Sequence, residues 1–144
     1  MSTNAEGAEF VELAMALYEF LERLRGEQEE AAALVRLTPA QATVLTSLTA
    51  PMSMRSLAQR MHCDPSNITG IVDRLEGKGL VERSVDPKDR RITRVAPTRS
   101  GHETLARFHD ELARLSSLTT LSPQVRQSLL TAVRDAQTPP TQDR

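Results

Sequence analysis

The chain has 144 residues, of which 39% are hydrophobic and 26% are charged, and its formal net charge is −1. This composition predicts a single soluble globular domain of ordinary size, and it excludes a membrane span, which needs about 18 consecutive apolar residues. The single cysteine excludes an internal disulfide framework, and no secretory signal is visible in the first residues, so we expect a cytoplasmic protein.

Helices are predicted for the first part of the chain. Over residues 8–30, apolar side chains recur at steps of three and four residues, which indicates a helix with one apolar stripe. Thr38 is typical of a helix cap, and Pro39 suits the first position of the helix that follows. The stretch "TAPMS" ends that helix in a short strand or turn, and a short helix is predicted over residues 54–61. The apolar stripe of the first helix consists of Phe10, Leu13, Ala14, Leu17, Leu21 and Leu24, and the positions expected to face inward in the next two helices are Ala42, Leu45, Leu48, Leu57, Ala58 and Met61.

Another helix is predicted to start at Asp64, because a carboxylate accepts backbone N–H groups and Pro65 lacks the N–H that would be left unbonded. Gly77 and Gly79 are expected to end this helix. Its apolar side is formed at helical spacing by Ile68, Ile71, Val72 and Leu75. Its opposite side is mostly small where a surface helix usually carries long solvated charges, and consists of Ser66, Gly70, Asp73, Arg74 and Gly77, flanked by Asn67 and Thr69.

The rest of the chain is predicted to form a hairpin and two more helices. Residues 80–85 and 92–97 alternate apolar and polar positions around the turn-rich loop "DPKDRR", which indicates two antiparallel strands. A long helix follows, and Ser122 is expected to cap a final one. This order predicts a mainly α fold with a small β-hairpin, arranged as a winged helix-turn-helix. The apolar positions of the two helices are Leu105, Phe108, Leu112, Leu115 and Leu118, then Val125, Leu129, Leu130 and Val133.

The charge is unevenly distributed along the chain. Residues 1–51 contain three Arg and eight Glu, a net of −5, whereas residues 52–101 contain ten Lys or Arg and six Asp or Glu, a net of +4. A positive block of this kind favours an anionic partner such as nucleic acid, although chance clustering of solvated charges remains an alternative. The chain has four aromatic residues and no tryptophan, so an aromatic platform that stacks the bases of single-stranded nucleic acid is not expected.

The segment "DPSNITGIVDRLEGKGLVERSVDPKDRRITRVAPTRSG" resembles the recognition helix and wing of the MarR family of bacterial transcription regulators. In that family the helix typically reads D-P-S-x-x-T-x-x-V-D-x-L-E-x-x-G-L-V. The wing carries a D-x-R-x-x-R element, matched here by Asp89, Arg91 and Arg94. The long helices at both ends lie where the family places its dimerisation helices, so the resemblance covers about residues 10–136. One departure is "VAPTRSG", in which Pro97 stands near the position where the family more often has leucine.

The resemblance implies a homodimeric regulator, a repressor in the first instance, that binds pseudo-palindromic double-stranded DNA. Each recognition helix would enter a major groove and each wing a minor groove, with half-sites about 10 base pairs apart. Family members are often released from DNA by a small aromatic or phenolic effector. The implied division is a dimerisation helix in residues 1–36, the DNA-binding domain in residues 37–99 and dimerisation helices in residues 100–144, with no cofactor, no metal and no membrane partner.

The DNA contacts are expected on the small-residue face of the helix and on the wing. Small side chains allow the helix backbone to approach base edges, and a helix N-terminus favours phosphate. Arg90 is the side chain expected in the minor groove, and Lys88 is expected on a phosphate. The family pattern gives Asp89 and Arg91, with Arg94, the role of bracing the wing. The full set of expected DNA contacts is Thr38, Arg55, Pro65, Ser66, Asn67, Thr69, Gly70, Arg74, Lys88 and Arg90, with Arg60 as a further flanking position that equally fits a surface charge.

Other sites and functions are weaker alternatives. Cys63 beside His62 fits a redox-sensing thiol or an enzyme with a thiol–imidazole pair, but a small buried thiol is the simpler interpretation. Three scattered histidines do not indicate a metal site. A winged-helix module that binds proteins and never DNA is the main competing function. A speculative effector cleft would be lined by Leu17, Leu21, Val44, Leu48 and Phe108, with Arg23 or Arg25 as a carboxylate partner, although all of these also fit ordinary core or surface positions.

Overall fold

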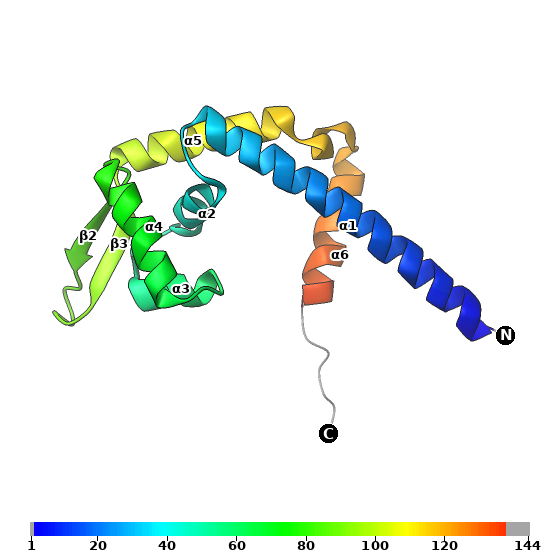
Figure 1. Ribbon diagram of the computed structural model, residues 1–144, viewed down its shortest axis with the longest axis horizontal. Helices are drawn as coiled ribbons and strands as arrows, with labels where there is room; N and C mark the ends of the chain where they lie inside the picture. Colours follow the sequence, from blue (N-terminus) through cyan, green and yellow to red (C-terminus); the bar gives the residue numbers. More distant parts are fainter. Residues whose placement is uncertain (1, 138–144) are drawn as a thin grey trace, which may run out of the picture.

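The computed structural model describes residues 2–137, which form a mainly helical fold with one small sheet. The predicted fold class is confirmed: a winged helix-turn-helix lobe lies at one end, and α1 and α6 extend away from it at the other (Figure 1). The elements in chain order are α1 (Ser2–Leu34), α2 (Pro39–Ser47), β1 (Met52–Ser53), α3 (Met54–Arg60), α4 (Pro65–Gly77), β2 (Val81–Val85), β3 (Thr93–Pro97), α5 (Arg99–Leu115), the 3-10 helix η1 (Ser117–Thr120) and α6 (Pro123–Gln137).

Helix α1 is longer than predicted, and its apolar stripe is exposed rather than buried. It spans Ser2–Leu34 instead of residues 8–30, and its C-terminal third packs along α5 (Figure 1). The predicted stripe is exposed, since Phe10 is 72% exposed and Leu21 is 54% exposed. Its apolar pattern is typical of a buried face, but no element within residues 2–137 covers it. The exposed apolar residues of α1 include Phe10, Val11, Leu13, Met15, Leu17, Tyr18 and Leu21.

The turn after α1 is fixed by its own backbone. Arg36 adopts the left-handed conformation, with φ of 59°. This allows its N–H to donate to Ala33 O over 3.0 Å and the N–H of Leu37 to donate to Ala32 O over 2.9 Å. The two bonds satisfy carbonyls that the end of a helix leaves unpaired. The chain therefore enters the helix-turn-helix lobe in a defined direction.

Helices α2, α3 and α4 surround the hydrophobic core of the lobe. The predicted cap at Thr38 is confirmed, because its hydroxyl accepts the N–H of Gln41 over 3.2 Å while its own N–H donates to Gln41 Oε1 over 3.1 Å. Ser53 caps α3 by accepting the N–H of Ser56 over 3.1 Å. The predicted inward residues Ala42, Leu45, Leu48, Leu57, Ala58, Ile68, Ile71, Val72 and Leu75 are buried, and Met61 is partly buried against them.

The predicted hairpin is confirmed and is joined by a third strand. Strands β2 and β3 pair antiparallel, with Arg83 opposite Val95, and β1 pairs with the other edge of β3, with Met52 opposite Val95. The sheet order is therefore β1-β3-β2. The pairing of β1 fixes the start of α3 to the base of the wing, so the helix-turn-helix and the wing form one unit.

A tight junction joins α4, β2 and α5. Gly79 has a φ of 69° and its N–H donates to Glu76 O over 2.8 Å, which ends α4 as predicted. The N-terminus of α5 then passes directly over the backbone of Leu80. A Cβ atom placed on Gly101 would lie 2.0 Å from the Leu80 carbonyl oxygen, so only glycine permits this approach.

The C-terminal helices differ from the prediction at their junction. The expected continuation of α5 to Leu118 is wrong: the helix ends at Leu115, because Ser116 is extended and its hydroxyl accepts the N–H of Leu118 over 3.2 Å. The cap of α6 at Ser122 is as predicted, since its hydroxyl accepts the N–H of Val125 over 3.3 Å. The apolar residues of α6 are exposed, namely Val125, Leu129, Leu130 and Val133.

Candidate nucleic-acid interface

The N-terminal end of α4 presents short polar side chains, and two of their hydroxyl groups donate hydrogen bonds within the chain. Asp64 accepts the N–H of Ser66 over 2.8 Å and its hydroxyl over 2.5 Å. The Thr69 hydroxyl donates to Pro65 O over 2.9 Å. The exposed lone pairs of both hydroxyls can therefore accept hydrogen bonds from an external donor, such as an amino group in the major groove. Within residues 2–137 the Asn67 side chain has no hydrogen-bond partner, so its amide is available as donor and acceptor.

The cap of α4 also carries a stable negative charge. The hydrogen bonds from the Ser66 hydroxyl and then from the Ser66 N–H lower the pKa of the Asp64 carboxyl below its usual 3.8. The carboxylate is thus ionised at neutral pH and stays bound to the helix end. It orients Ser66 at the start of the exposed polar face of α4.

The face of α4 opposite the core is open. A Cβ atom added to Gly70 or Gly77 would meet no heavy atom within 4 Å. Ser66, Asn67 and Thr69 are exposed, whereas the apolar side of the helix is buried. The small side chains leave the helix backbone within reach of a partner surface, as predicted.

Arg83 on β2 neutralises the acidic residues of α4. Its guanidinium binds Asp73 over 2.5 Å and also binds Glu76. Partial burial opposes the charge of this guanidinium, but the hydrogen bonds that it donates to Asp73 and Glu76 outweigh this effect and raise the pKa of Arg83. Sequence reasoning found no partner for Asp73, because Arg83 becomes its neighbour only when β2 folds back along the helix. These two ion pairs, which we call the Arg83 clamp, neutralise two negative charges on α4 that would repel a phosphate. They also attach β2 of the wing to α4.

The wing is braced by Asp86 and Arg94, and this corrects the predicted pairing. Asp86 is 3% exposed and accepts the N–H of Lys88 over 2.7 Å, while its other oxygen binds Arg94. Arg94 also donates to Pro51 O over 3.2 Å and so ties the wing to the segment that leads into β1. The expected ion pair between Asp89 and Arg91 is absent from the described residues. Asp89 instead accepts the backbone N–H of Arg91 over 3.0 Å.

Sequence reasoning missed Asp86, although a signal for it existed. An aspartate before proline that opens a loop is typical of a turn in which the carboxylate accepts N–H groups two or three residues on. The N–H groups of Lys88 and Asp89 both donate to it, the second over 3.2 Å. The bond from Lys88 first, and that from Arg94 second, lower the pKa of the Asp86 carboxyl below its usual 3.8.

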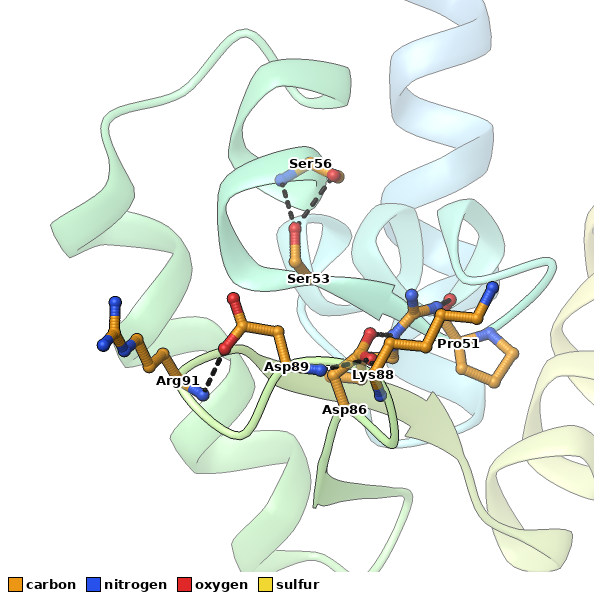
Figure 2. A network of polar contacts seen from close by, with 8 residues as sticks. Pro51, Ser53, Ser56, Asp86, Lys88, Asp89 and Arg91 are labelled. Carbon is orange, nitrogen blue, oxygen red and sulfur yellow. Dashed lines mark hydrogen bonds and ion pairs between the residues drawn. The ribbon is translucent and has the colours of Figure 1, made fainter.

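Because Asp89 accepts the backbone N–H of Arg91, the Arg91 guanidinium is free to act outside the wing. Figure 2 shows it pointing away from the Asp89 carboxylate. Arg91 and Arg55 line a groove of about 440 Å³ between α3 and the wing, together with Ser53 and Ile92. Five cationic side chains near the α4 and wing surface have no acceptor within residues 2–137, and these are Arg55, Arg74, Lys88, Arg90 and Arg91.

Two other predicted flanking positions have structural partners. Arg60 donates to Ser47 O over 3.3 Å and so binds the C-terminal end of α2. Thr38 is occupied in the cap of α2, beside the C-terminal end of α4, where Lys78 reaches Gln41 over 3.1 Å. Because α4 has 13 residues, this end lies about 18 Å of helix from Ser66.

The residues of the speculative effector cleft do not line one cavity in the described part of the chain. Val44, Leu48 and Phe108 are within the core, with exposures of 0%, 2% and 3%. Leu17 and Leu21 lie instead in a groove of about 280 Å³ along α1, formed with Phe10, Leu13, Ala14 and Tyr18. Of the two arginines considered as carboxylate partners, Arg25 pairs with Glu22 over 3.6 Å on the exposed side of α1, and Arg23 is exposed.

The remaining candidate groups form no further site in residues 2–137. Cys63 is half-buried and packs against the core, and no hydrogen bond joins it to His62. No group of three or more His, Cys, Asp and Glu in the described residues could hold a metal ion. Among these residues, no helix has both the length and the apolar character needed to cross a bilayer.

Comparison with known proteins agrees with this geometry. Residues 37–93 match the family model described as the MarR family. A curated relative, the HTH-type transcriptional repressor MdtR of Bacillus subtilis (strain 168), is 32% identical over 127 residues, which cover 84% of this chain and 82% of that protein.

Solved structures show the same arrangement of elements. The transcriptional repressor CouR, bound to a 23-mer DNA duplex, is 32% identical, with a TM-score of 0.75 over 88% of this chain and 92% of that one. A mutant MarR from E. coli, complexed with operator DNA, has a TM-score of 0.72 over 90% of this chain and 96% of that one. At 23% identity the second likeness supports the fold alone.

Proposed function

The chain belongs to the MarR family, and we propose that it is a dimeric regulator that binds duplex DNA through α4 and the wing, in the manner of a repressor. The observation that carries the proposal is the pattern of charge neutralisation. Asp73 of α4 and Asp86 of the wing are paired with Arg83 and Arg94, and Asp64 is held in the cap of α4 by Ser66. The cations around them are left without internal partners and are available for phosphates.

We assign the reading of bases to the first turns of α4 and the reading of groove shape to the wing. The hydroxyls of Ser66 and Thr69 present lone pairs, and Asn67 presents a whole amide, so these three residues suit base edges in the major groove. Arg90 at the tip of the wing suits a narrow minor groove, where negative potential is concentrated. Arg55, Arg74 and Lys88 suit phosphates.

We further propose that a second copy of the chain covers the exposed apolar faces of α1 and α6. Contiguous apolar surface of this kind marks an interaction site, and a symmetric dimer is its commonest use. Two copies would place two α4 helices on one face, as binding to a pseudo-palindrome requires. In this proposal, residues 1–36 and 100–144 form the dimer and residues 37–99 bind DNA in the cytoplasm.

The dimer is tested by sedimentation equilibrium. Leu17→Arg places a charge in the α1 groove, and we expect a shift from dimer to monomer together with loss of specific DNA binding. Leu34→Arg is the control, because Leu34 is also exposed on α1 but lies outside that groove. A monomeric wild-type protein would contradict the proposal.

The competing function is a winged-helix module that binds proteins only. Such a module has no need of unpaired cations on both the recognition helix and the wing. The two functions are separated by fluorescence anisotropy with a selected duplex over a range of salt concentrations. Specific binding with a steep negative salt slope supports DNA binding. Equal, weak binding to all duplexes favours the protein module.

Release of the DNA by a small aromatic effector is proposed on the family resemblance alone. The groove along α1 would be covered in the dimer, so a cleft for such an effector would have to be completed by the second subunit. A panel of small aromatic acids, tested for a shift in melting temperature and for loss of DNA binding, checks this part.

A further inference from the structure

Lys78 forms a polar link between the recognition helix and the turn that follows α1. It is the C-cap residue of α4, and its side chain reaches back across the lobe. Its ammonium donates to Arg36 O over 2.7 Å and to Gln41 Oε1 over 3.1 Å. These acceptors lie 42 and 37 residues earlier in the chain. One side chain therefore connects α4, α2 and the end of the long helix that we assign to the dimer.

Both acceptors are held in place by features that do not involve Lys78. Arg36 is in the left-handed conformation that ends α1, which directs its carbonyl out of the helix. Gln41 is 4% exposed, and its Oε1 also accepts the N–H of Thr38 in the cap of α2. An isolated surface ion pair stabilises little, but a cation between two fixed acceptors defines a direction as well as a contact.

The other polar attachments of the α4 side chains lie within the DNA-binding lobe, where Asp73 and Glu76 bind Arg83 of β2. Its apolar side packs in a hydrophobic core to which α1 contributes Ala31 and Ala32 and α5 contributes Phe108. Among the polar contacts in residues 2–137, the bond from Lys78 to Arg36 connects this helix to the turn leaving α1. The shared core holds α4 near α1, and the hydrogen bonds of Lys78 add a directional constraint at the C-terminal end of α4.

The length of α4 amplifies a change at this end. The reading residues begin about 18 Å of helix away from Lys78. A rotation of about 10° at the link would move them by about 3 Å, which is close to one base-pair step of about 3.4 Å. In a dimer both recognition helices would shift in this way, so the spacing between them would no longer be defined to one base pair.

We propose that Lys78 is a positioning residue that sets the spacing at which the dimer reads its two half-sites, by fixing α4 to the turn after α1. This inference rests on the proposed dimeric DNA binding. Lys78 itself makes no contact with DNA in this arrangement. Its loss should therefore alter the preference for half-site spacing without changing the number of phosphates that are neutralised.

The test compares Lys78→Met with Lys88→Met, which removes the same charge from the wing. Affinities are measured for duplexes with the selected half-site spacing and with one base pair inserted or removed, at several salt concentrations. For Lys78→Met we expect about fivefold to tenfold weaker binding at the selected spacing, which corresponds to the loss of roughly one hydrogen bond. The affinity for duplexes with the altered spacings should change little. The salt slope of this variant should equal that of the wild type. Lys88→Met should instead lower the salt slope by about 1 and keep the spacing preference.

A second measurement follows the same link without DNA. Cys63, the single cysteine, directly precedes the cap of α4, so a nitroxide on it reports one distance between the two helices of a dimer. We expect a wider distance distribution in Lys78→Met than in the wild type, while the melting temperature confirms that the variant is folded.

The outcomes separate this inference from the proposed function. Equal spacing preferences and equal distance distributions in Lys78→Met and the wild type would overturn the role of Lys78. A salt slope lowered by about 1 in Lys78→Met, with an unchanged spacing preference, would make Lys78 a phosphate contact and overturn it too. A wild-type protein that selects no duplex would contradict the proposed function, and the distance measurement would still test the link.

Discussion

Replacement of Gly70 by alanine should separate the stability of the protein from its affinity for DNA. Gly70 lies in the middle of α4, and an added Cβ would meet no heavy atom within 4 Å. Alanine is favoured over glycine within a helix by up to about 1 kcal/mol, so the free protein should become more stable by about 0.5–1 kcal/mol. In the proposed complex, however, the same methyl group on the open face of α4 would point toward the DNA.

The cost in binding follows from close approach. If the backbone at Gly70 contacts the DNA, the methyl group must displace α4 or its partner, and we expect affinity to fall about tenfold, equivalent to about 1.4 kcal/mol. The gain in stability cannot cause this loss, since a folded protein does not bind less because it is more stable. The two effects therefore have opposite signs only if this face meets DNA.

The assay pairs urea unfolding with anisotropy on the selected duplex. Gly26→Ala is the matched control, because Gly26 lies within α1 and an added Cβ is equally unobstructed there. It should give a similar gain in stability with unchanged affinity. Wild-type affinity in Gly70→Ala would refute the close approach of α4, and a loss of stability would refute the open face.

Three further predictions concern the wing and the junction with α5. Arg90→Ala should weaken specific binding and lower the salt slope by about 1, and an unchanged slope in a salt titration would remove Arg90 from the DNA contacts. Because the pKa of Asp86 is lowered, its stabilising effect is present above the usual aspartate value of 3.8 and is lost as pH falls through the lowered value. Asp86→Asn should therefore be less stable than the wild type at pH 7, and it should lose less stability than the wild type as the pH falls. Parallel curves of stability against pH, from pH 2 to 7, would contradict the role of Asp86 as a brace. Gly101→Ala should destabilise by about 2 kcal/mol in urea unfolding despite better helix propensity, because its Cβ would lie 2.0 Å from Leu80 O, and equal or higher stability would show that this junction can relax.

Local signals in the sequence were sufficient to predict most of the elements. The cap at Thr38 and the start at Asp64 and Pro65 each involve residues close together in the chain, so propensity and spacing identify them. The buried stripe of α4 follows from a 3.6-residue period, and the wing strands follow from a period of two. These patterns do not depend on the rest of the fold.

The features that the sequence did not reveal depend on contacts between distant parts of the chain. Phe10 is exposed because nothing in residues 2–137 packs over its side of α1, and a periodic pattern alone does not say what covers an apolar face. The clamp from Arg83 to Asp73 requires β2 to lie beside α4, and the bond from Arg94 to Pro51 spans 43 residues. The family pattern assigns the bracing of the wing to Asp89, whereas the turn geometry places the brace at Asp86.

Sequence-specific DNA binding is tested most directly by selecting bound duplexes from a random library with the wild-type protein. We expect an enriched pseudo-palindrome with half-sites about 10 base pairs apart, bound by one dimer. Its affinity should fall steeply with salt and should fall further when Asn67 is replaced by alanine, with altered preference at the contacted bases. A library that yields no enriched palindrome, or binding that is equally weak for all sequences, would contradict the conclusion that this chain is a sequence-specific DNA-binding regulator.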